Sequence, residues 1–138
     1  MILKAALSSL SVICREMELI IDSKNHIIFL LSGEVGAGKT ALIKEYVKFK
    51  GLNYNVTSPT FNILHQYGEN LFHYDLYNRN LEDLLNLGLF DLLGQDGIHF
   101  VEWGNKELFN MLSLAYDNVN FIKIINTTKS NDYRIYEF

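Results

Sequence analysis

Residues 27–40 read Ile-Ile-Phe-Leu-Leu-Ser-Gly-Glu-Val-Gly-Ala-Gly-Lys-Thr, and this stretch decides the fold. Its first five residues are apolar and have the length of a strand that is buried on both faces. A glycine-rich loop follows and matches the pattern G-x-x-x-x-G-K-[ST] over Gly33-Glu34-Val35-Gly36-Ala37-Gly38-Lys39-Thr40. A helix is expected next, from about residue 39 to residue 50, with Gly51 at its C-terminal cap. The order of strand, glycine loop and helix predicts a phosphate-binding turn.

The composition of this loop follows from the chemistry of phosphate binding. Glycines let the backbone turn tightly with its N–H groups pointing inward, which makes a nest for an anion. Lys39 supplies a charge for the β- and γ-phosphates, and Thr40 offers a hydroxyl to Mg²⁺. The helix that starts at Lys39 adds the positive end of its dipole. The loop therefore predicts a P-loop domain that binds ATP, or a related nucleotide, with Mg²⁺.

Hydrolysis needs more than the loop, and three later motifs offer the missing groups. Residues 98–102 form an apolar strand that ends in Glu102, the Walker B pattern, so this carboxylate is expected on Mg²⁺, directly or through a water, or near the nucleophile. Trp103 follows, either as a packing aromatic or as a ring near the nucleotide or a partner. Ser58 and Thr60 lie in a loop from which a hydroxyl could reach the metal or the γ-phosphate.

Residues 61–67 and 71–77 have the alternating pattern of a β-hairpin. The alternation puts His73 and Asp75 on one face, where Asp75 could ligate Mg²⁺ or orient a water; the alternative is a solvated acid. His65 and His73 could be neighbours across the hairpin. Two histidines without cysteine support are a poor zinc site, so we do not expect zinc there.

The remaining chain predicts an α/β fold: one P-loop NTPase-like domain over residues 1–138, with a mixed central sheet that includes the hairpin and is flanked by helices. The other expected elements are a helix over 2–20, a short strand over 54–57, helical residues 81–93 with a break near Gly88, a strand over 98–102, a helix over 105–112, and strands over 119–125 and 133–138.

Composition excludes several classes of protein. The 138 residues are 49% hydrophobic and carry a net charge of −4, which argues against tight nonspecific binding to nucleic acid. Cys14 is the only cysteine, so we expect no disulfide partner and a reducing compartment. No apolar run approaches the about 20 residues of a membrane span, and the N-terminus lacks the features of a signal peptide. A cytoplasmic protein without membrane contact is expected.

Five segments together resemble the TsaE (YjeE) family, small bacterial P-loop ATPases needed to make threonylcarbamoyladenosine in tRNA. They are GEVGAGKT, SPTF, HYDLYNR, LEDLLNLGL and FVEWGN, and the match runs from about residue 31 to residue 105. The resemblance implies a phosphate contact for Lys39 and binding of Mg²⁺, directly or through water, by Thr40 and Glu102. It also implies a nucleotide-sensing loop with Ser58 and Thr60, a catalytic-site acid at Asp75 and a functionally sensitive aromatic at Trp103.

The resemblance also implies partners. The family works with TsaB and TsaD, the pair that transfers the threonylcarbamoyl group to tRNA, and its ATPase supports turnover of that complex. Contact with tRNA would therefore be indirect. The family usually has arginine directly after its D-L-Y, whereas this chain has Asn78 there and Arg79 one position later.

Three other functions remain as alternatives. A small-molecule kinase usually surrounds the transferred phosphoryl group with arginines, but this chain has only Arg15, Arg79 and Arg134. A GTPase is less favoured than an ATPase, because residues 105–108 imitate N-K-x-D but end in leucine, which cannot accept hydrogen bonds from guanine. A nucleotide-controlled binding module would order its loops for a partner and hydrolyse little. The scarcity of arginine fits weak ATPase activity that rises in a complex.

Overall fold

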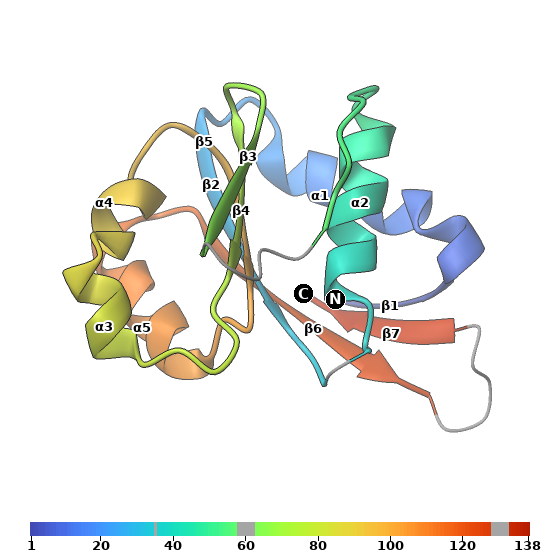
Figure 1. The fold of residues 1–138 in the computed structure, drawn as a ribbon. Helices are drawn as coiled ribbons and strands as arrows, with labels where there is room; N and C mark the ends of the chain where they lie inside the picture. The colour runs from blue at the N-terminus through green and yellow to red at the C-terminus, as the bar shows by residue number, and fades with distance from the viewer. Residues whose placement is uncertain (35, 58–62, 128–132) are drawn as a thin grey trace.

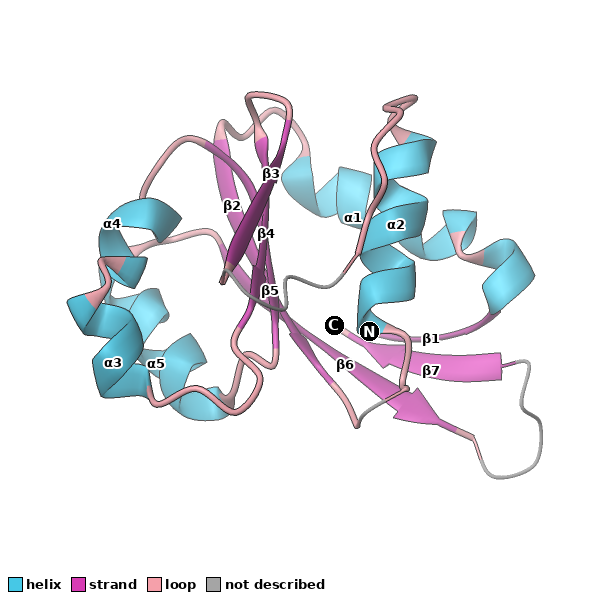
Figure 2. Cartoon of the chain, in the orientation of Figure 1, coloured by secondary structure: helices cyan, strands magenta, loops and turns pink. Residues whose placement is uncertain are grey.

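The computed structural model describes residues 1–34, 36–57, 63–127 and 133–138. Its centre is a seven-stranded sheet in the order β1-β7-β6-β2-β5-β4-β3. Helices α1 and α2 lie on one side of the sheet, and α3, α4 and α5 lie on the other (Figure 1; Figure 2). The predicted α/β class and the sheet flanked by helices are confirmed.

The longest connection along the chain is the one between α2 and β3, residues 50–63. Their bounds are β1 (Ile2–Ala6), a 3₁₀ helix (Leu7–Ser9), α1 (Ser11–Ile21), β2 (His26–Ser32), α2 (Lys39–Phe49), β3 (Leu64–Tyr67), β4 (Leu71–Asp75), α3 (Leu81–Asn86), α4 (Leu89–Leu93), β5 (Gly97–Glu102), α5 (Lys106–Ala115), β6 (Val119–Asn126) and β7 (Tyr133–Glu137).

Strand pairing makes the sheet mixed, as predicted. β2 lies between β5 and β6 and is parallel to both, and β4 is parallel to β5. The pairs β1–β7, β6–β7 and β3–β4 are antiparallel. The carboxyl ends of β2 and β5 therefore meet at one edge of the sheet, which is where open α/β sheets bind ligands.

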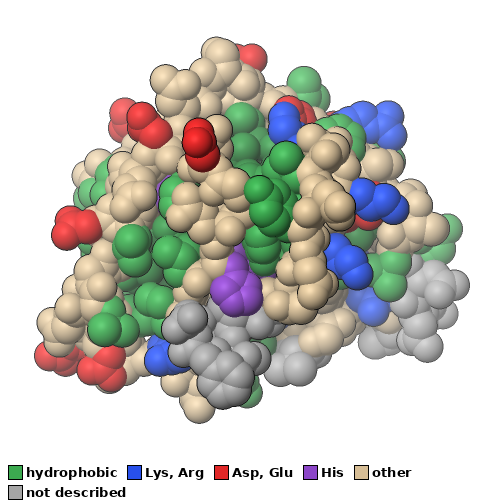
Figure 3. Space-filling view, turned by 45° about the horizontal axis from the view of Figure 1, so that its top comes forward, with side chains coloured by type: hydrophobic (Ala, Val, Ile, Leu, Met, Phe, Trp, Pro, Cys, Tyr) green, Lys and Arg blue, Asp and Glu red, His purple; other side chains and the backbone are tan. Residues whose placement is uncertain are grey.

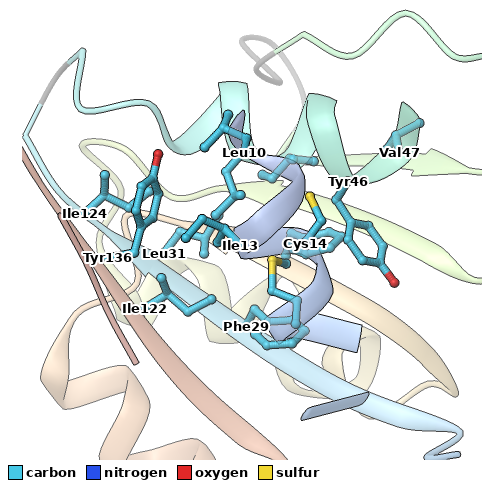
Figure 4. Packing of buried hydrophobic residues seen from close by; sticks show 14 of the residues in the cluster. Leu10, Ile13, Cys14, Phe29, Leu31, Tyr46, Val47, Ile122, Ile124 and Tyr136 are labelled. Atoms are coloured by element: carbon cyan, nitrogen blue, oxygen red, sulfur yellow. The ribbon is translucent and has the colours of Figure 1, made fainter. Parts of the chain in front are cut away.

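The sheet separates two hydrophobic clusters. The cluster under α1 and α2 contains Ile13, Phe29 and Tyr46, and Figure 4 shows these side chains converging between the helices and the sheet. The second cluster lies under α3, α4 and α5 and includes Leu30 and Val101. Because neighbouring residues of β2 enter opposite clusters, this strand is buried on both faces, as its apolar run predicts.

Two sequence predictions are wrong. The helix expected over residues 2–20 begins only at Ser11, because Ile2–Ala6 pair with β7 as the edge strand of the sheet. Within that strand the residues alternate between more exposed and more buried positions, and Ala5 reaches the core. Residues 54–57 form no strand: only Val56 is buried, and Tyr54 packs on Tyr67 from outside the sheet.

The hairpin and the later helices match their predictions. β3 and β4 form the hairpin, although its predicted residues 61 and 62 lie outside the described residues. The break between α3 and α4 falls at Gly88, whose φ of 88° is the left-handed conformation that favours glycine. α2 ends at Phe49, and Gly51 with φ of 75° follows its cap.

The two helical layers differ in surface charge. α2 and its C-cap expose Lys44, Lys48 and Lys50, whereas α3 exposes Glu82 and Asp83. Figure 3 shows most basic side chains on one side of the molecule and mainly acidic ones on the other. Within the described ranges, no helix has the length and apolar character needed to cross a membrane.

Candidate functional site

The glycine loop connects β2 to α2 at the carboxyl edge of the sheet (Figure 1). Gly36 and Gly38 have φ of 79° and 108°, and Gly38 is the N-cap of α2. A Cβ on Gly33 would lie 2.7 Å from the carbonyl oxygen of Ile124 in β6. These positions need glycine for conformation or for close approach, as a phosphate-binding loop requires.

Lys39 is folded back against this loop. Its Nζ donates to the carbonyl oxygens of Gly33 and Glu34 at 2.7 Å and 3.0 Å. The same ammonium group lies 3.8 Å from the ring centroid of Trp103, within the range of a cation–π contact. Lys39 is 4% exposed, so these contacts replace most of its water.

Burial lowers the pKa of Lys39 from its ordinary value, and the carboxylates of Glu102 and Asp75 partly offset that effect. Desolvation disfavours the charged ammonium, whereas nearby negative charges favour it. An anionic ligand in the loop would act in the same direction as the two carboxylates. Such a ligand would therefore stabilise the charged form of Lys39.

Thr40 and Glu102 meet across the site. The Thr40 hydroxyl lies 2.8 Å and 2.9 Å from the two carboxylate oxygens of Glu102 and can donate its single proton to either. Glu102 ends β5, pairs in register with Leu31 of β2 and is 3% exposed. A hydroxyl beside a carboxylate is a donor set that suits Mg²⁺, which prefers oxygen ligands and retains several waters.

The structure adds two residues that the sequence interpretation did not place here. His73 Nε2 lies 2.5 Å from Glu102 Oε2, and the other ring nitrogen of His73 lies 2.9 Å from the Tyr67 hydroxyl. The alternating pattern of the hairpin puts His73 on the same face as Asp75, and this pattern is the sequence signal that could have placed His73 in the site. The sequence interpretation of His73 is limited to a possible zinc site with His65, which is its cross-strand partner. Among the described residues, no group of three His, Cys, Asp or Glu side chains could hold a metal.

Asp75 and Trp103 border the same region. Asp75 is half-buried and pairs in register with Glu102, and its Oδ1 accepts from the backbone N–H of Tyr77. Trp103 has a left-handed φ of 65°, which is uncommon outside glycine, and its ring packs on Tyr77 with centroids 4.8 Å apart. Its backbone N–H donates to the carbonyl of Leu31, so the turn after β5 is fixed against β2.

A cavity of about 280 Å³ opens beside Lys39, Glu102 and Trp103, and Asp75 is not among the residues that line it. Its walls are Gly36, Gly38, Lys39, Thr40, Ala41, Glu102 and Trp103. Six predicted site residues therefore line this cavity: Gly36, Gly38, Lys39, Thr40, Trp103 and the predicted acid Glu102. Val35, Ser58 and Thr60 lie outside the described residues.

Two further predicted residues of the loop lie close by with different surroundings. Ala37 is 1% exposed and belongs to the core, whereas Glu34 is exposed and contributes its carbonyl to Lys39.

Asn105, part of the GTPase-like segment, accepts a hydrogen bond from the backbone N–H of Leu108 and caps α5. That segment is therefore the start of a helix.

The chain is similar to known proteins in sequence and in fold. The family model "Threonylcarbamoyl adenosine biosynthesis protein TsaE" matches residues 7–134. The tRNA threonylcarbamoyladenosine biosynthesis protein TsaE of Rickettsia typhi is 37% identical over 107 residues, covering 74% of this chain and 72% of the relative. TsaE of Haemophilus influenzae is 34% identical over 95 residues, which is 66% of this chain and 60% of the relative. The crystal structure of YdiB from Bacillus subtilis superposes with a TM-score of 0.65 at 22% identity, over 99% of this chain and 83% of YdiB.

Proposed function

The chain belongs to the TsaE family of tRNA threonylcarbamoyladenosine biosynthesis proteins, and on that premise we propose that it binds ATP with Mg²⁺ in the Gly33–Thr40 loop and hydrolyses it. The hydrolysis supports turnover of the TsaB–TsaD transferase, so contact with tRNA is indirect. The observation that carries this proposal is the Thr40 hydroxyl, 2.8 Å from the buried Glu102 carboxylate at the wall of the loop cavity.

In this proposal the loop and Lys39 hold the phosphates. The N-terminus of α2, an eleven-residue helix, opens onto the cavity and favours an anion there. Phosphate oxygens replace the carbonyl oxygens of Gly33 and Glu34 as partners of the Lys39 ammonium group. This exchange favours phosphate, because a hydrogen bond between two charged groups is stronger than one to a neutral carbonyl.

Thr40 and Glu102 are the proposed residues for Mg²⁺. Two protein oxygens leave room for phosphate oxygens and water in an octahedral shell, which is how Mg²⁺ usually binds in nucleotide sites. When bound, the ion supplies neutralisation of the charge that develops on the phosphates. Glu102 has a second role, because it accepts the Thr40 hydroxyl proton and so leaves the lone pairs of that oxygen for the cation.

Asp75 is the proposed acid for the attacking water. Its backbone is in register with Glu102, and its half-buried side chain lies on the same face of the sheet. Glu102 already accepts hydrogen bonds from Thr40 and His73, which leaves less of its carboxylate for a nucleophile. We therefore assign orientation of the water to Asp75 and ligation to Glu102.

Slow hydrolysis by the isolated protein follows from the charge of the cavity. Of the described residues that line it, Lys39 is the only basic one. Phosphoryl transfer is accelerated by additional positive groups, commonly an arginine supplied by a partner. The complex with TsaB and TsaD is the proposed source of that acceleration.

The test is hydrolysis of ATP and GTP with Mg²⁺, by the protein alone and with cognate TsaB and TsaD. We expect ATP-selective activity that is slow alone, rises with the pair and disappears in Lys39→Ala. Lys44→Ala is the matched control, because Lys44 is an exposed lysine on the same helix. Phosphorylation of a screened metabolite, without any effect of the pair, would instead identify a kinase. Tight ATP binding without hydrolysis under all conditions would identify a nucleotide-controlled binding module.

A further inference from the structure

His73 connects the candidate metal site to the interior of the sheet. It is fully buried in β4, two residues before Asp75, which is the position that pairs in register with Glu102. Its Nε2 lies 2.5 Å from Glu102 Oε2, and its Nδ1 lies 2.9 Å from the Tyr67 hydroxyl on β3. The hydrogen-bonded chain therefore runs from Tyr67 through His73 and Glu102 to Thr40.

The protons along this chain can be assigned from the Glu102 carboxylate. Glu102 as a carboxylate can only accept, so Nε2 of His73 must donate to it, and Nδ1 of the neutral ring is left to accept the proton of the Tyr67 hydroxyl. A neutral ring that accepts at Nδ1 carries its proton at Nε2. That proton is donated to Glu102 Oε2, and every polar group of the chain is then satisfied.

Glu102 needs such a fixed donor. Its carboxylate is 3% exposed, and its hydrogen-bond partners within the described residues are the Thr40 hydroxyl and His73. The Thr40 hydroxyl rotates and contacts both carboxylate oxygens, so it does not select one of them. His73 contacts Oε2 alone and is held from behind by Tyr67.

We infer that His73 is a positioning residue for Mg²⁺–ATP, which holds Glu102 Oε2 so that Oε1 and the Thr40 hydroxyl face the cation. The inference rests on the proposed function, because it assigns a role in metal binding to that same site. Residues that orient metal ligands in this way typically change metal affinity or activity 10- to 100-fold when they are replaced.

A second buried histidine shows what a merely structural arrangement looks like in this sheet. His99 on β5 is also fully buried and also contacts a tyrosine, Tyr74, through Nδ1 at 2.8 Å. Its Nε2 ends on the backbone carbonyl of Gln95 at 2.7 Å. Nε2 of His73 instead contacts the Glu102 carboxylate, which borders the loop cavity. This difference distinguishes a residue that positions a ligand from one that only packs in the sheet.

The experiment compares ATP affinity with Mg²⁺ and with EDTA, measured by isothermal titration calorimetry on the full chain with a slowly hydrolysed ATP analogue. His73→Leu removes the donor at similar volume, and His73→Gln restores an N–H donor at the position of Nε2. We expect His73→Leu to reduce the gain in affinity due to Mg²⁺ by about tenfold or more, and His73→Gln to retain most of it. Affinity in EDTA should be unchanged in both, and His99→Leu should keep the full gain due to Mg²⁺.

Several results would overturn the inference. One is a folded His73→Leu variant whose ATP affinity still rises fully with Mg²⁺. Another is a His73→Gln variant that loses as much of this rise as His73→Leu does, because side-chain shape rather than the hydrogen bond would then matter. If His73→Leu does not fold, Tyr67→Phe decides: a reduced gain supports the inference and an unchanged gain refutes it. Lys39→Ala distinguishes failure of this inference from failure of the proposed function, because an unchanged ATP affinity in that variant would refute the proposed function itself.

Discussion

Replacement of His99 tests how the buried polar groups of the sheet respond to acid. Burial lowers the pKa of His99 to about 4, partly offset by its bond to the Gln95 carbonyl, and the nearby ring of His26 lowers it further. His99 is therefore neutral in the folded protein, with Nε2–H donated to Gln95 and Nδ1 accepting from Tyr74. In the unfolded chain the same side chain titrates near its ordinary value of 6.5.

The sign and size of the effect follow from these two values. Between pH 6.5 and pH 4 the unfolded chain binds a proton that the folded protein does not, so the free energy of unfolding falls as the pH falls through this window. Each pKa unit corresponds to about 1.4 kcal/mol, so the full effect is about 3 kcal/mol. Between pH 7 and pH 5 the loss is about 2 kcal/mol, because most of the window lies in that range.

The assay is urea unfolding followed by circular dichroism at half-unit steps from pH 7 to pH 5. His99→Gln keeps an N–H donor for the Gln95 carbonyl but has no proton to gain. We expect the variant to be less stable than the wild type at pH 7, with that difference shrinking by about 2 kcal/mol at pH 5. Tyr74→Phe is the control, since it removes a hydrogen bond but leaves the histidine in place. Parallel curves for wild type and His99→Gln over this range would refute the reasoning.

Three further predictions concern the loop. Gly33→Ala places a Cβ 2.7 Å from a backbone carbonyl oxygen of β6, so we expect a loss of about 1–3 kcal/mol in the free energy of unfolding together with weaker ATP binding, measured by urea unfolding and calorimetry. Trp103 is the only tryptophan and lies 3.8 Å from the Lys39 ammonium group, so its fluorescence should change on addition of Mg²⁺–ATP; an unchanged spectrum at saturation would contradict the proposed movement of Lys39. Thr40→Val removes the hydroxyl beside Glu102 at similar volume, and we expect roughly tenfold more Mg²⁺ to be needed for half-maximal hydrolysis, whereas an unchanged requirement would remove Thr40 from the metal site.

The parts of the fold that the sequence predicts well are those with strong local signals. The apolar run of β2, the glycine loop and the helix after it adjoin one another in the chain, so pattern and spacing are sufficient. Glu102 could be predicted because an apolar strand ending in an acid is a local pattern, and a parallel sheet brings its end beside β2. The hairpin was also predictable from its alternation.

The prediction for the N-terminal strand was wrong for the opposite reason. Residues 2–6 have apolar spacings that also fit a helix, and the choice between the two depends on β7, more than 120 residues further along the chain. Backbone hydrogen bonds to that strand outweigh the weak local preference for a helix. A single sequence contains no local signal for such a partner.

The two buried histidines show the same limit within the site. His73 and His99 each lie in an apolar strand, each contacts a tyrosine, and each donates from Nε2, so residue type and burial do not separate them. The register separates them: β4 and β5 are parallel, and His73 lies on the same face as Glu102, toward α2, whereas His99 lies on the opposite face. A shift of one residue in either strand would turn His73 away from Glu102 and leave that buried carboxylate with the Thr40 hydroxyl as its remaining donor. The register of the β4–β5 pair is therefore as important for the candidate metal site as the glycine loop, although no motif marks it.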